Sequence, residues 1–145
     1  MIKNSLDKLL ALCDSVPDQI RRLGEHEIDR KPTQDRWSKK EIIGHLCDSA
    51  FVNIQRLIRG QVETEPQIFY DQDKWVNVQN YTGYNPEELI TLWFALNKHF
   101  YHIAISMSEQ DLKRVYLDRE GNKLTLKFLI DDYLIHLMHH LSQII

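Results

Sequence analysis

The sequence predicts an all-α protein folded as a four-helix bundle, and two observations favour this class. Apolar residues recur at steps of three and four along four segments of roughly 20 residues each. Only five Gly and four Pro interrupt the 145 residues. A helix of that length is about 30 Å long. Four such helices, with one long crossover between the second and the third, make a bundle, and the length fits a single domain over residues 1–145.

The first expected helix covers about residues 4–25, and apolar residues mark one of its faces: Leu6, Leu9, Cys13, Val16 and Ile20. Gly24 is a typical C-terminal stop. Residues 25–37 are polar, contain a proline and have no apolar period, so we expect a connecting loop there. His26 should be an exposed residue of that loop.

The second expected helix begins at Ser38 and continues to about Gly60. Ser38 and Glu41 have the S-x-x-E spacing of a capping box. His45 and Asp48 lie on or beside the apolar face of this segment, which must turn toward the interior of the bundle.

Residues 61–85 form the long crossover. They are rich in aromatic and polar residues and lack a clean period. We expect an irregular segment with a helical turn near residues 73–79. Because a long structureless connection is uncommon in a compact domain unless it is functional, this segment is a candidate lid over a site.

The third expected helix opens with Asn85 as cap and Pro86 in the first turn, and runs to about residue 107. Its seam is expected to include four residues: Leu92, Leu96, His99 and Ile103. A short helical restart at residues 108–111 and a hairpin-like link over 115–124 should follow. Thr125 then opens the last helix.

Composition and charge exclude several classes of function. A net charge of −3 and a pI near 6.1 provide no footprint for nucleic acid or an anionic membrane. The first residues reach charged side chains too early for a signal peptide, and no stretch approaches ~18 uncharged apolar residues. We therefore expect a cytoplasmic protein that acts on a small molecule, with Cys13 and Cys47 as reduced, buried residues.

Three of the seven histidines fall within five residues of the last helix. His136 and His140 are four residues apart, so both imidazoles can reach one metal ion. A stable site needs a ligand from another element, and His45 is the best candidate. His139 also pairs with His136, at three residues, but we assign it to the surroundings of the site or to a helix interface. Three neutral imidazoles leave positions open around a divalent ion, as in catalytic sites.

Two acids are candidates for catalytic roles beside these ligands. Asp48 follows His45 by three residues, and Asp132 precedes His136 by four. Either could orient an imidazole, as carboxylates commonly do at metal sites, or act as a general base.

Other interpretations of these residues remain open. The histidines could be hydrogen-bonded core residues without a metal, and His99 is more typical of such a core residue. The metal could stabilise a non-catalytic bundle that acts as a binding or stress-response protein. An interaction module without metal is a third interpretation. Apolar helix faces favour a homodimer.

Residues 37–49, which contain His45, and residues 136–144, which contain the histidine pair, together resemble the DinB/YfiT-like superfamily. The resemblance covers nearly the whole chain. It implies a four-helix bundle in which His45, His136 and His140 hold a divalent ion, with zinc and nickel the leading metals. The superfamily includes thiol S-transferases that use bacillithiol or mycothiol, and a mycothiol-dependent isomerase. The resemblance therefore implies transfer of a low-molecular-weight thiol to an electrophile, with metal-activated water for hydrolysis as the other branch.

Overall fold

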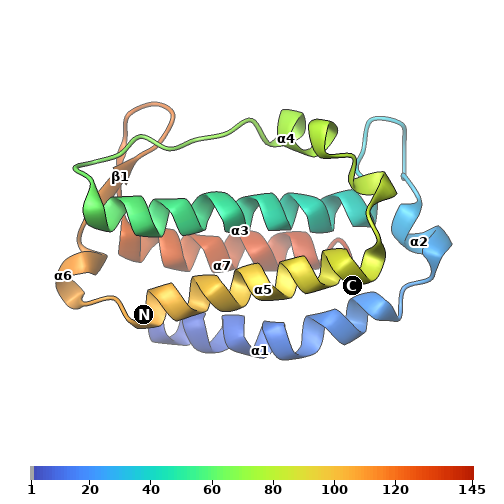
Figure 1. The fold of residues 1–145 in the computed structure, drawn as a ribbon, viewed down its shortest axis with the longest axis horizontal. Helices are drawn as coiled ribbons and strands as arrows, with labels where there is room; N and C mark the ends of the chain where they lie inside the picture. The colour runs from blue at the N-terminus through green and yellow to red at the C-terminus, as the bar shows by residue number, and fades with distance from the viewer. Residues whose placement is uncertain (1) are drawn as a thin grey trace.

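Four long helices packed side by side form the protein, which a computed structural model describes over residues 2–145 (Figure 1). These are α1 (Ile2–Arg21), α3 (Lys39–Val62), α5 (Pro86–Ile105) and α7 (Leu126–Leu141). Helices α1 and α3 each pack against both α5 and α7. The expected all-α four-helix bundle is confirmed.

Short elements join the long helices. They are α2 (Glu25–Asp29), α4 (Gln72–Gln79), a 3-10 helix η1 (Tyr81–Gly83), α6 (Glu109–Leu112) and the strands β1 (Val115–Leu117) and β2 (Lys123–Thr125). The two strands pair antiparallel, with Val115 opposite Thr125. Gly121 has a positive φ of 82° in the turn between them, a conformation in which glycine carries no steric penalty. None of the helices of residues 2–145 is long and apolar enough to cross a bilayer.

Side-chain caps set the starts of α3, α5 and α7 where the sequence placed them. The Ser38 and Glu41 side chains form the expected capping box at the start of α3. The side chain of Asn85 caps α5 and that of Thr125 caps α7. Each cap accepts a hydrogen bond from a backbone N–H that has no partner within the helix.

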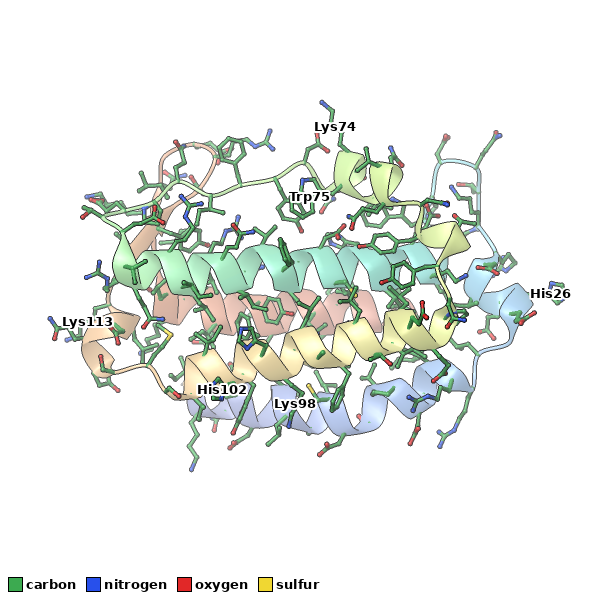
Figure 2. The ribbon with its side chains drawn as sticks, in the orientation of Figure 1. His26, Lys74, Trp75, Lys98, His102 and Lys113 are labelled. Carbon is green, nitrogen blue, oxygen red and sulfur yellow. The ribbon has the colours of Figure 1, made fainter. Side chains whose placement is uncertain are left out.

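Two boundaries near the N-terminus differ from the prediction. Helix α1 ends at Arg21, short of residue 25. The segment expected to be a loop over 25–37 begins with α2, because Ile28 is buried against the core while acids occupy the first turn. Acidic side chains are favourable at the positive end of a helix dipole. His26 lies exposed on α2 and projects away from the bundle (Figure 2).

The crossover from α3 to α5 runs along the outer side of α3 (Figure 1). The expected helical turn near residues 73–79 is α4, capped by the side chain of Asp71. Trp75 points from α4 toward α3 (Figure 2), where its ring lies 6.4 Å from that of Phe51. The backbone of Gln67 also pairs with that of Leu117 in β1. These contacts hold the crossover against the bundle.

The buried face of α5 is a second correction. The prediction set His99 in the seam, but His99 is exposed and stacks with His102. Trp93, Asn97 and Phe100 point inward instead. Both stripes have helical spacing, and the one that buries the two large aromatic rings removes more apolar surface from water. Asn97 is satisfied in the core, since it donates to the carbonyl of Trp93 and accepts a hydrogen bond of 2.6 Å from the Tyr133 hydroxyl.

Candidate metal centre

Helices α3 and α7 bring three histidines to one point. His45 lies in the N-terminal third of α3, and His136 and His140 lie on successive turns of α7. The ring centre of His45 is 5.3 Å from that of His136 and 4.8 Å from that of His140. One nitrogen from each ring lies within 4.8 Å of the other two. The structure thus brings together the three residues that the sequence singled out as ligands.

The two imidazoles of α7 already have the spacing of a ligand pair. Their Nε2 atoms are 3.1 Å apart, and two nitrogens bound about 2.0–2.1 Å from one zinc ion stand at a similar separation. The Nδ1 atom of His140 lies 3.0 Å from Oε1 of Gln143. Because an amide oxygen only accepts, Nδ1 is the donor in this bond, and in the neutral ring the lone pair is then on Nε2. Such an outer hydrogen bond is typical of metal-binding histidines.

His45 is fully buried, and both of its ring nitrogens lack a hydrogen-bond partner. Buried polar atoms in proteins are nearly always partnered, so an orphaned imidazole facing two other imidazoles requires an explanation. A metal ion would satisfy one nitrogen. The indole of Trp37 covers the ring at 4.9 Å. The residues present therefore fit a divalent ion.

The surroundings of His45 and His136 favour neutral imidazoles at these two residues. Burial, then His140 and His136, lowers the pKa of His45 to about 3. Burial, then His140 and His139, lowers the pKa of His136 to about 4. Since only a neutral imidazole has a lone pair for a metal, both residues are ready to bind one at neutral pH.

The two candidate acids occupy different positions. Asp48 is buried, and its Oδ1 accepts hydrogen bonds from the Tyr81 hydroxyl at 2.6 Å and from Gln79 at 2.8 Å. Burial raises the pKa of Asp48, and this effect outweighs the two hydrogen bonds, which lower it. It makes no hydrogen bond to His45. Asp132 is exposed and lines a cavity together with His136.

His139 and Cys47 lie near the cluster in the chain but are not part of it. His139 is exposed, with its ring 5.2 Å from that of His140. Cys47 is buried, and burial raises the pKa of its thiol well above the usual range. A thiol that stays protonated is a poor nucleophile, so Cys47 acts as a small core residue, as expected.

Two cavities flank the three histidines along the groove between α3 and α7. One, of about 320 Å³, is lined by His140, Gln143, Trp37 and the basic side chains of Arg30 and Arg36. The other, of about 200 Å³, is lined by His136, Asp132 and residues further along α3. The cluster therefore has access to space on both sides.

Comparison with known proteins places the chain in a family. The family model of the DinB superfamily matches residues 3–144. The chain belongs to the DinB superfamily. A relative from Oceanobacillus iheyensis, named "Putative metal-dependent hydrolase", is 27% identical over 124 residues, which span 84% of this chain and 71% of the relative. A Bacillus cereus protein of the same name is 22% identical over 145 residues, spanning 99% of this chain and 83% of the relative.

Solved structures share the fold of this DinB chain. YfiT from Bacillus subtilis, described as a "probable metal-dependent hydrolase with an unusual four-helix bundle topology", superposes with a TM-score of 0.82 at 21% identity, covering 96% of this chain and 83% of YfiT. The mycothiol-dependent maleylpyruvate isomerase superposes with a TM-score of 0.78 at 12% identity, covering 97% of this chain and 60% of the isomerase. At these identities the likeness concerns the fold alone.

Sequence reasoning missed the residues that surround the trio. Gln143 follows His140 by three residues, so its contact with the ring was readable from helical spacing. Two other features depend on how distant segments pack and cannot be read from local spacing. Trp37 covers the ring of His45, and Arg56 lines the second cavity.

Proposed function

We propose that this protein is a metal-dependent enzyme in which His45, His136 and His140 hold a divalent ion, zinc or nickel. The ion would activate a low-molecular-weight thiol for transfer to an electrophile, or water for hydrolysis. One observation carries the proposal: the buried His45 ring, with both nitrogens unpartnered, faces two half-buried imidazoles.

A divalent ion held by three neutral imidazoles would keep its positive charge, and it would lower the pKa of a thiol or water in an open position. The protein's own residues prepare that position. Gln143 holds the His140 ring with Nε2 turned toward His136, and Trp37 shields His45 from solvent.

Asp132 is the candidate proton acceptor in this proposal. Its carboxylate lines the same cavity as His136 and is engaged in no ion pair or hydrogen bond among residues 2–145. A carboxylate without such partners is available to take the proton that an incoming thiol or water releases. Asp48 would instead act as a positioning residue, because its bonds to Tyr81 and Gln79 fasten the crossover to α3 beside His45.

The cavities on both sides of the histidines support catalysis over a purely stabilising metal, because a structural site is usually closed by protein ligands. The names of the relatives support a metal-dependent reaction. A name that mentions hydrolysis favours water, and the mycothiol-dependent isomerase favours a thiol.

Elemental analysis of protein purified without an affinity tag tests the metal. We expect close to one divalent ion per chain in the wild type, and little in His136→Ala. His139→Ala is the matched control, since His139 lies in the same turn but outside the trio, and it should keep the metal. No bound metal, or equal metal in both variants, would refute the proposal.

Activity assays separate the two branches. A chlorinated aromatic electrophile should be consumed by the metal-loaded protein only when a thiol is added, if the protein is a transferase. Turnover of ester or amide substrates without thiol would identify the hydrolase branch.

A further inference from the structure

The smaller cavity beside the histidines is built mainly from hydrogen-bond donors. It lies between α3, α7 and the crossover and is lined by His136, Ser49, Asn53, Arg56, Tyr70 and Tyr116, with Asp132 also on its wall. Ser49, Asn53 and Tyr116 are buried, while Arg56 and Tyr70 are half-buried. A set of hydroxyl and guanidinium groups of this kind suits a ligand rich in acceptors.

Arg56 is held rigidly at this cavity. Its Nε and Nη2 donate to the carbonyl of Ile68 at 3.2 and 2.8 Å, and its Nη1 donates to Oδ1 of Asn53 at 3.1 Å. The guanidinium also lies over the ring of Tyr116, 5.1 Å from its centre. A side chain fixed by three such contacts loses little conformational entropy when it binds a ligand.

The positive charge of Arg56 has no carboxylate partner among residues 2–145. Of the five N–H groups of a guanidinium, the bonds to Ile68 and Asn53 use three. One N–H on each terminal nitrogen is left. Two such donors match the two oxygens of a carboxylate.

The size and charge of the cavity restrict which ligands it can accept. At about 200 Å³ the cavity is smaller than the roughly 300–1,000 Å³ of sites that hold drug-sized ligands, so it suits a small ligand or one end of a larger one. The carboxylate of Asp132 on the same wall disfavours a doubly charged anion such as phosphate. A singly charged carboxylate is the oxyanion that fits.

We propose that Arg56 anchors the carboxylate of a small substrate or thiol whose reacting end reaches the three histidines. The inference rests on the proposed function for the reacting end, since His136 belongs both to the cavity and to the cluster. Arg56 is then the residue that selects carboxylate-bearing ligands.

Binding of propionate to metal-free protein tests the anchor without any metal. Amide chemical shifts should change around Ser49, Asn53 and Arg56 on addition of propionate. The uncharged isostere propionamide should bind at least tenfold more weakly, because a charge-assisted hydrogen bond is lost. This comparison uses the wild-type chain, so it does not depend on a variant folding.

Arg56→Gln should remove the preference for propionate over propionamide. Arg59→Gln is the matched control, because Arg59 is on the same helix but pairs with Glu63 and lines neither cavity. Equal binding of the two probes to the wild type, shifts centred on Arg30 and Arg36, or tighter binding of inorganic phosphate would each overturn the proposal.

A second arm links the anchor to the histidines. On nickel-loaded protein, 3-mercaptopropionate should give a thiolate-to-nickel absorption band at a concentration about tenfold lower than 2-mercaptoethanol requires, and Arg56→Gln should abolish that difference. Propionate binding without any metal uptake would retain the anchor and refute the proposed function. Metal uptake with equal affinity for the two thiols would retain the proposed metal site and refute the role of Arg56 as an anchor.

Discussion

Gly44 is a position at which one added methyl group should disturb both the fold and the site. It precedes His45 on α3, and the ring of Tyr81 from η1 lies directly over it. A Cβ at residue 44 would overlap the Cγ, Cδ2 and Cε2 atoms of that ring. The ring is buried and its hydroxyl donates to Asp48 at 2.6 Å, so it cannot move without breaking that bond.

Opposing terms set the size of the effect of Gly44→Ala. Alanine in a helix interior is favoured over glycine by about 1 kcal/mol. Overpacking a filled core costs about 1–3 kcal/mol. Loss of the Tyr81 hydrogen bond from buried Asp48 costs about 1–3 kcal/mol more. The steric terms win, and we expect the free energy of unfolding to fall by about 1–5 kcal/mol.

Urea denaturation of four proteins measures this: wild type, Gly44→Ala, Tyr81→Ala and the double variant. In the Tyr81→Ala background the overlap is gone, so Gly44→Ala should become stabilising by up to about 1 kcal/mol. Gly24→Ala is a control, because a Cβ there meets nothing within 4 Å. A Gly44→Ala cost that is the same in both backgrounds would refute the reasoning.

Two further predictions concern the buried polar groups. The pKa values of His45 and His136 lie at about 3 and about 4, below the ordinary 6.5. Between these values and 6.5 the unfolded chain binds more protons than the folded chain. In chelator, the protein should therefore keep the stability contributed by these two histidines above pH 6.5 and lose it as the pH falls from there toward 4. Urea midpoints measured across that range check it, and a flat profile would contradict it. Tyr133→Phe leaves Oδ1 of buried Asn97 without its donor, so it should lower the free energy of unfolding by about 1–3 kcal/mol. The control is Tyr101→Phe, which should change this free energy little because the Tyr101 hydroxyl makes no hydrogen bond within residues 2–145.

Local patterns in the sequence determined the bundle and the starts of its helices. Ser38, Asn85 and Thr125 were identifiable as caps because a side-chain oxygen satisfies backbone N–H groups only a few residues away. The spacing of His136 and His140 likewise placed two imidazoles on one helical face before any packing was known. These features depend on contacts within about one turn of helix.

Tertiary packing decided what local spacing left open. Two stripes of α5 have helical periodicity, and the burial of Trp93 and Phe100 against the other helices turned His99 to solvent. Part of the expected loop over 25–37 forms α2 instead, because Ile28 is buried in the core. The homodimer stays a prediction, since it depends on surfaces that meet between chains.

The same division holds at the site. The sequence by itself named His45, His136 and His140, because few residue types bind metals and their spacing restricts which can meet. Only the tertiary structure brought α3 against α7 with the three rings together, left the His45 nitrogens without partners and joined Asp48 to Tyr81. It also placed Arg56 and His136 in the lining of one cavity. Those relations join residues far apart in the chain, and their distances follow from how the helices pack.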